Sequence, residues 1–357
     1  MFNKIFGTLC VAASTSCMAS EATDHLFLEG ADGGAGQGKH IVLLAGDEEY
    51  RSEEAMPMLG QILASHGFDC TVLFSLDDEG KYVDPMNHKS LSHSVALDSA
   101  DAIVMSIRFR NWADEDMDRF NAALERGVPM IALRTSTHAF KIEADKKYAK
   151  FDWRSKVEGW KNGFGRQVLG ESWVSHHGAH KTEATRTHIE EANKDHALLN
   201  GVGSIFCETD VYGANPLQPS TILLRGEVTA SFDKDSAGVD KKNNPMMPVA
   251  WTREFKNANG ATNKILTTTM GAASDLVDEN LRRLVVNGVY WATGLEVPAK
   301  ADVDYKSVYK PTFYGVKKGK ELMHQKEQFP ADFLNVDIND DPMNHYIDRK
   351  APKKAKK

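Results

Sequence analysis

The apolar positions of the chain form short continuous runs that alternate with segments of helical spacing. Four of the runs have the length of a strand and are almost entirely apolar: residues 41–45, 71–75, 103–106 and 130–133. Strands that are apolar on both faces are typical of a parallel sheet with helices on both sides. The pattern therefore predicts four interior strands of one such sheet.

Three other segments have the spacing and the ends of helices. Residues 52–66 begin with acids and stop at Gly67, and residues 113–126 place apolar side chains on one face and stop at Gly127. A third helix is predicted over residues 274–293. Strands that alternate with helices predict an α/β fold with a doubly wound, mainly parallel sheet.

The order of these elements predicts a single domain with a long inserted excursion. Residues 141–220 lack clear periodicity and are rich in Trp, His and Gly, and long excursions of this kind are usually functional. Two strands joined by the turn KNANGAT follow it. We predict a signal peptide over 1–20, a linker over 21–38, the α/β domain over 39–295, and a C-terminal extension with a basic tail over 296–357.

The amino terminus predicts export. Residues 1–20 combine a lysine, an apolar run and small residues, as a cleaved secretory signal does. The run is too short to span a bilayer, and no later segment approaches that length. We therefore expect a secreted or periplasmic protein with no membrane span.

Composition narrows the class of protein. With 41% apolar and 26% charged residues the chain is globular, and its formal charge of −7 disfavours nucleic acid as a partner. Beyond the signal segment only Cys70 and Cys207 remain, so the fold does not depend on a disulfide framework. These two cysteines either form one bridge or are buried free thiols.

Charged side chains gather where the predicted strands end. The third strand runs into Arg108 and Arg110, and the fourth into Arg134, Ser136 and His138. Since the carboxyl ends of parallel strands share one edge, which is the usual ligand face, the three arginines are candidates for binding carboxylate or dense hydroxyl groups. The alternative is that they pair with acids of the strand ends or of the loop GDEEYRSEE.

Histidines are the best candidates for acid and base groups, because their pKa lies near neutrality. They cluster as His138 after the fourth strand and as His176, His177 and His180 in SHHGAH. We assign proton transfer to His138 and His177 and substrate binding to His176. We predict no cofactor. A zinc or iron site built from His138, His177 and Asp210 is the alternative.

Several phrases together resemble the ThuA-like, or trehalose-utilisation, family: IVLLAGDEEYRSEEA, IALRTSTHAF, GFGRQVLGESWVSHHG, ETDVYG, NPMMPVAWTREF and TTTMGAASDLVDENLRRLVVNGVYWATGLE. The resemblance implies a flavodoxin-like fold similar to the class I glutamine amidotransferases and a role in sugar utilisation. By register, Arg134 stands about where those enzymes carry their cysteine nucleophile. An arginine cannot be a nucleophile, since it stays protonated.

Asp210 and Tyr212 in ETDVYG and Asp275 in MGAASD complete the predicted substrate-binding set, although Asp275 could instead cap the last helix. Our first hypothesis is an enzyme that acts on a small-molecule or oligosaccharide substrate, a sugar or keto-sugar, by acid and base chemistry. The alternatives are a non-catalytic carbohydrate-binding protein and a metal-dependent hydrolase.

Overall fold

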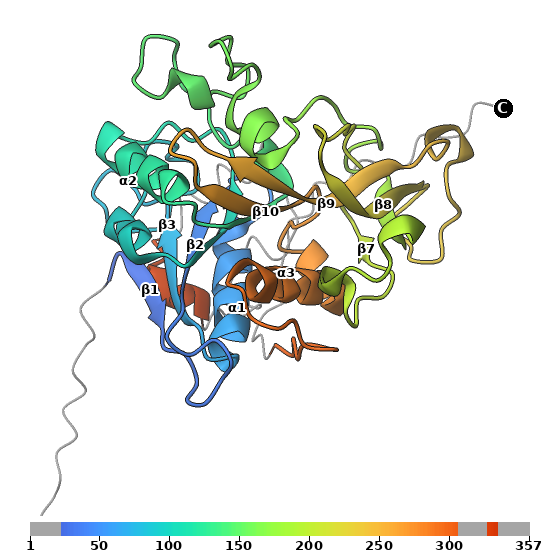
Figure 1. Ribbon diagram of the computed structural model, residues 1–357, viewed down its shortest axis with the longest axis horizontal. Coiled ribbons are helices and arrows are strands. Elements are labelled where there is room, and N and C mark those ends of the chain that lie inside the picture. Colours follow the sequence, from blue (N-terminus) through green and yellow to red (C-terminus); the bar gives the residue numbers. More distant parts are fainter. Residues whose placement is uncertain (1–22, 306–326, 335–357) are drawn as a thin grey trace, which may run out of the picture.

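The computed structural model describes residues 23–305 and 327–334. The predicted signal peptide and basic tail lie outside these residues, as does part of the C-terminal extension. A mixed sheet of ten strands runs through the middle of the described part of the chain, in the order β1-β3-β2-β4-β5-β10-β9-β8-β6-β7 (Figure 1).

The strands and α-helices are β1 His25–Leu28, β2 His40–Gly46, α1 Ser52–Ser65, β3 Asp69–Phe74, β4 Ala102–Ile107, α2 Asp114–Glu125, β5 Met130–Leu133, β6 Ala184–Ile189, β7 Phe206–Cys207, β8 Thr221–Thr229, β9 Met247–Lys256, β10 Thr262–Thr268 and α3 Glu279–Ala292. The four predicted interior strands are confirmed as β2, β3, β4 and β5. The α/β class is confirmed with them.

One half of the sheet is parallel and the other is antiparallel. Strands β3, β2, β4, β5 and β10 run parallel to one another. β9, β8, β6 and β7 continue the sheet from β10 as antiparallel strands, and β1 adds an antiparallel edge to β3. The short turn between β9 and β10 permits only antiparallel pairing, whereas each parallel neighbour is reached by a longer crossover.

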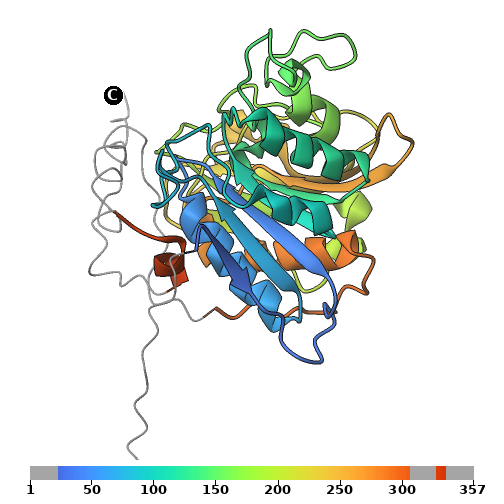
Figure 2. The same ribbon diagram turned by 90° about the vertical axis from the view of Figure 1, so that its left-hand side faces the viewer.

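Helices cover both faces of the parallel strands. Figures 1 and 2 show α1 and α3 together on one face and α2 on the other. Aromatic side chains of the excursion also cover the sheet face on which α2 lies. There Phe151 and Phe164 pack against Phe120 and Phe140. The excursion is thus anchored in the core at its start and is held over the carboxyl ends of the strands.

The two cysteines and the last described segment complete the core. Cys70 and Cys207 are buried free thiols, so they form no bridge. A short 3₁₀ helix, Pro330–Leu334, places the Phe333 ring 6.0 Å from that of Phe74. Among the described residues no helix has both the length and the apolar character needed to cross a bilayer.

Candidate functional site

The fourth predicted strand ends in a tight, strained turn. β5 passes directly into a 3₁₀ helix, Arg134–His138, whose side chains are all buried. Arg134 has a φ of 41°. This left-handed backbone conformation is energetically unfavourable for any residue that carries a Cβ atom. The excursion lies against this turn, because a Cβ on Gly165 would stand 2.0 Å from the carbonyl oxygen of Thr137. Only glycine permits that approach.

The Arg134 side chain turns inward and is fully buried. Its Nη1 donates to the backbone carbonyls of Asp210 and Thr269, both at 2.7 Å, and its Nη2 donates to Oδ1 of Asp210 at 3.0 Å. The guanidinium carbon lies 3.9 Å from the centre of the Tyr212 ring and 4.8 Å from that of Tyr50. Of the two interpretations of Arg134, the structure shows pairing with an acid.

The Asp210 carboxylate joins two histidines of the excursion. Its Oδ2 lies 2.7 Å from Nδ1 of His176, and its Oδ1 lies 2.9 Å from Nδ1 of His180. Burial alone would raise the pKa of Asp210, but the Arg134 charge and the two histidine hydrogen bonds outweigh it and lower the pKa below its usual range. The His180 Nε2 in turn lies 3.3 Å from Oε1 of Glu49. We call His176, His180 and Asp210 the Asp210 cluster.

His138 lies beside this cluster in an aromatic niche, which we define by the four rings around its imidazole. The ring centres lie 5.0, 6.3, 5.6 and 6.4 Å away for Phe109, Trp153, Trp173 and Tyr212 respectively. Phe109, Trp153 and Trp173 are half-buried, whereas Tyr212 is buried. The niche thus has apolar walls, three of which are partly accessible to solvent.

His138 itself is only 4% exposed. Burial and the charge of Arg108 lower its pKa well below the ordinary value, so the imidazole is neutral. Its Nδ1 lies 3.3 Å from Oγ1 of Thr137. Trp173 contacts both His138 and His176, with ring centres 5.6 and 5.5 Å away. A neutral imidazole and the Asp210 cluster therefore share one indole as a neighbour.

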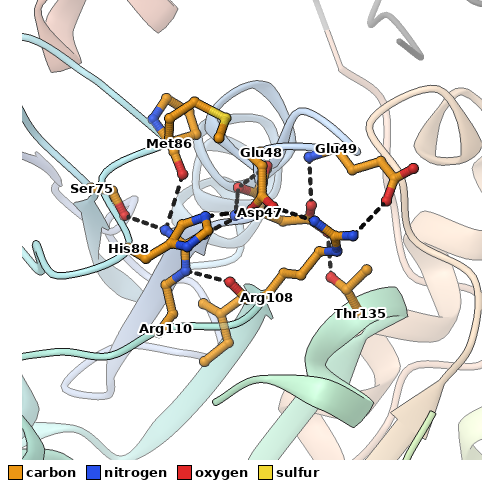
Figure 3. A network of polar contacts seen from close by, with 12 residues as sticks. Asp47, Glu48, Glu49, Ser75, Met86, His88, Arg108, Arg110 and Thr135 are labelled. Atoms are coloured by element: carbon orange, nitrogen blue, oxygen red, sulfur yellow. Dashed lines mark hydrogen bonds and ion pairs between the residues drawn. The ribbon is translucent and has the colours of Figure 1, made fainter. Parts of the chain in front are cut away.

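The loop after β2 neutralises the arginines that end β4 (Figure 3). Arg108 and Arg110 both pair with Glu48, and Arg108 also reaches Glu49 at 3.2 Å. Arg110 is completely buried and donates further to Oγ of Ser75 at 3.1 Å. The His88 imidazole, whose Nε2 lies 3.6 Å from Oε1, and the two guanidinium charges bring the pKa of Glu48 down to about 2 against the opposing effect of burial. Arg110 is therefore a structural group, whereas the Arg108 side chain keeps 19% of its surface exposed.

Asp47 is a second buried carboxylate beneath the site. Its Oδ1 accepts hydrogen bonds from the backbone N–H groups of Glu49 and Tyr50, and Thr135 donates to its Oδ2 (Figure 3). Burial and the neighbouring charge of Glu48 raise the pKa of Asp47 to about 6. This group changes charge near neutrality, although composition and spacing did not single it out.

His177 lies apart from the other predicted site residues. Its Nε2 points to the carbonyl oxygen of Lys242 at 2.6 Å, while the neighbouring side chain, that of His176, turns to Asp210. The structure thus brings His176, rather than His177, to the side of His138. The alternative metal site of His138, His177 and Asp210 is likewise not assembled.

Asp275 is a buried structural acceptor. It takes hydrogen bonds from the backbone N–H groups of Gly271 and Ala272 and from the hydroxyl of Thr209. The N-cap of α3 is Asp278, whose carboxylate accepts a hydrogen bond from the backbone N–H of Asn280 at 2.8 Å. The expectation that Asp275 caps the last helix is therefore wrong. Its carboxylate instead fixes the turn after β10.

Sequence reasoning left Glu49 and His180 out of the predicted site. Both were visible as residue types, since Glu49 belongs to the acidic loop and His180 follows His176 by four positions. A spacing of four places two residues on one face of a helix, but Gly178 between these histidines argues against a helix there. The structure shows that no helix is needed: an isolated β-bridge between His176 and Tyr212 holds the loop.

A cavity of about 540 Å³ lies on the excursion side of the antiparallel strands and is lined by none of the residues of the niche or the Asp210 cluster. Val174 and Gly213 contribute to its wall and directly follow Trp173 and Tyr212 in the chain. Its lining is mostly apolar and comes from the excursion, from β8 and from the start of β9 with the loop before it: Glu171, Val174, Gly213, Ala214, Asn215, Pro216, Gln218, Ile222, Arg225, Pro245, Met246, Met247 and Pro248.

Comparison with known proteins gives one family match. The family model named ThuA, described as trehalose utilisation, matches residues 41–292. Similar solved structures include a ThuA-like protein from Parabacteroides merdae ATCC 43184, with 14% identity and a TM-score of 0.45, over 79% of this chain and 98% of that one. The exo-β-1,4-mannosidase Op5Man5 from Opitutaceae bacterium strain TAV5 shows 9% identity and a TM-score of 0.32, over 71% of this chain and 35% of that one. No curated protein sequence matches the chain.

Proposed function

Because the chain belongs to the ThuA family of trehalose utilisation, we propose that it is an enzyme that acts on a sugar or keto-sugar by proton transfer. The observation that carries the proposal is the neutral His138 imidazole beside the Asp210 cluster, in an aromatic niche whose half-buried rings are partly accessible to solvent. Half-buried indole and phenyl faces suit the apolar faces of a sugar ring. The cluster offers polar groups to the hydroxyl or carbonyl oxygens of the same ring.

The roles of the individual groups follow from their surroundings. His138 is neutral, so it can accept a proton from a hydroxyl or from a carbon next to a carbonyl. Arg108 carries a permanent charge at the rim and can stabilise an oxyanion that develops there. His177 is replaced by His176 as the partner of His138 in this proposal.

No covalent intermediate is needed. The parallel strands follow the order β3-β2-β4-β5-β10, which corresponds to the wound order of flavodoxin-like sheets, and this supports the amidotransferase-like fold that the resemblance implies. In that reading the strained turn at Arg134 is a remnant of a nucleophile elbow.

Ser136 is the nearest hydroxyl candidate for attack, but its Oγ already donates to the carbonyl of Met105 at 3.0 Å. Ser136→Ala should therefore leave turnover unchanged.

The test is steady-state kinetics on oligosaccharides and their keto derivatives. His138→Gln should lower turnover by about two to four orders of magnitude, the usual loss for a general acid or base. His188→Gln is the matched control, because 48% of the His188 side chain is exposed on the far, antiparallel half of the sheet. If His138→Gln weakens sugar binding and no variant or wild-type protein turns over any sugar, the chain is a binding protein instead.

We further propose export, on the grounds of the amino-terminal pattern alone. The mature chain should begin near Ser20 or Glu21. Amino-terminal sequencing of the protein recovered outside the cytoplasm tests this directly. A chain that still begins at Met1 would contradict it.

A further inference from the structure

The Asp210 cluster has the donor atoms and the spacing of a metal site. One imidazole nitrogen of His176, one of His180 and a carboxylate oxygen of Asp210 all lie within 4.8 Å of one another. Ligands that share one ion at 2.0–2.2 Å stand about 3 to 4 Å apart, so small side-chain rotations bring the three atoms onto one centre. Two imidazoles and one carboxylate form the donor set of many zinc and non-haem iron sites.

The backbone holds this loop in place before any ligand binds. The N–H groups of His177 and Gly178 both donate to the carbonyl of Val211 at 2.9 Å, which ties the histidine loop to the residue after Asp210. A Cβ on Gly178 would stand 3.0 Å from Cβ of Asp210, so the glycine permits the close approach. The two histidine rings lie 4.5 Å apart and 31° from parallel. Preorganisation of this kind is what a metal site requires.

The neighbours of the cluster are those that orient metal ligands. Arg134 donates to Oδ1 of Asp210 and leaves Oδ2 facing His176. On the other side, Glu49 lies 3.3 Å from the second ring nitrogen of His180. A carboxylate on the far nitrogen of a ligating histidine fixes its tautomer and its orientation, and this arrangement is common around zinc.

We propose that His176, His180 and Asp210 bind one divalent first-row transition-metal ion, through one imidazole nitrogen of each histidine and a carboxylate oxygen of Asp210. His176 is the most exposed of the three, with 35% of its side chain accessible, so a sugar oxygen can approach the ion from its side. The inference rests on the proposed function for its role: the ion polarises a carbonyl or hydroxyl oxygen of the sugar while His138 moves the proton. The metal site itself does not depend on that role.

A second cluster in the described residues must be separated from this one. Asp24, His25 and His93 also place three donor atoms within 4.8 Å, close to the amino-terminal strand. His93→Gln removes a donor there and leaves the Asp210 cluster intact. This variant is therefore the matched control.

The experiment titrates the purified, chelator-treated full chain with Zn²⁺ by calorimetry and with Co²⁺ by visible absorption. His176→Gln and His180→Gln should each weaken binding by about 100-fold or more, and Glu49→Gln by about 10- to 100-fold, as the loss of an orienting partner does. His93→Gln should leave this binding event unchanged. Circular dichroism verifies that each variant is folded.

Two results would overturn the proposal: wild-type protein that binds neither ion, or binding that survives in folded His176→Gln and His180→Gln and is lost in His93→Gln. Failure of the proposed function looks different. His138→Gln should keep the metal while it loses turnover. A wild-type protein that binds the metal at the Asp210 cluster but acts on no sugar would retain the site and refute the enzymatic role.

Discussion

Replacement of Asp47 by asparagine should change how the stability of the protein depends on pH. Asp47 is fully buried, and its pKa is raised from an ordinary 3.8 to about 6 by burial and by the neighbouring Glu48 charge. The folded state therefore holds this proton more tightly than the unfolded state does. The resulting stabilisation is fully present below about pH 4 and is lost as the pH rises through about 6.

The magnitude follows from the difference between the two pKa values. A tenfold change in proton affinity corresponds to about 1.4 kcal/mol, so the group removes about 3 kcal/mol from the free energy of unfolding between pH 4 and pH 7. Asparagine is uncharged throughout and keeps an oxygen to accept from the N–H of Glu49. Asp47→Asn should thus gain stability relative to the wild type as the pH rises. Glu48, with its pKa lowered to about 2, changes charge below this window.

Urea denaturation of the wild type and Asp47→Asn at pH 4, 5, 6 and 7 measures the effect. The difference between their free energies of unfolding should change by about 3 kcal/mol across the series, with most of the change between pH 4 and 6. Glu115→Gln, whose side chain is 82% exposed on α2, is the carboxylate-to-amide control and should show no such trend. Parallel curves for wild type and Asp47→Asn would refute the raised pKa and the burial argument behind it.

Two further substitutions and one labelling reaction test the buried residues that support the site. Arg134→Lys should lower the free energy of unfolding by about 1–3 kcal/mol in thermal or urea denaturation, because one ammonium cannot replace the fork that binds Asp210. Gly271→Ala should lower the free energy of unfolding by a similar amount, because the φ of Gly271 is 123° and a Cβ there would stand 2.8 Å from Cβ of Leu133. Gly203→Ala is the unstrained control. Burial raises the pKa of both the Cys70 and the Cys207 thiols, so a thiol reagent should label them only after unfolding.

The parallel half of the sheet could be predicted from the sequence because its signal is strong and local. Residues 41–45 and 103–106 are apolar at every or nearly every position, and only a strand buried on both faces requires that. The pairing of arginines with the acidic loop after β2 was one of two open interpretations. The choice between them depends on side-chain direction at the sheet edge, where Arg110 points inward and Arg108 remains partly exposed.

The excursion could not be predicted at the same level. β6 has the sequence ATRTHI, in which Thr185 and Thr187 are buried while Ile189 is exposed, so burial does not follow polarity and no apolar alternation marks the strand. His176 and His177 are adjacent, and nothing local to the sequence decides which of them faces the site. That choice is made by the β-bridge between His176 and Tyr212, a contact over 36 positions of sequence. Long-range pairing of this kind leaves no periodic trace.

The position of Arg134 explains why no nucleophile is expected at the first position of the turn that ends β5. A nucleophile at such a turn must point outward to meet a substrate, whereas Arg134 points inward and gives its hydrogen bonds to Asp210 and Thr269. The strain of its backbone is retained, but it now places a buried charge beneath the excursion. That charge keeps Asp210 ionised, and ionised Asp210 holds the two histidines. The turn therefore contributes His138 directly and supports the histidine loop through Arg134, which is why Arg134→Lys should disturb that loop even though the Arg134 side chain is fully buried.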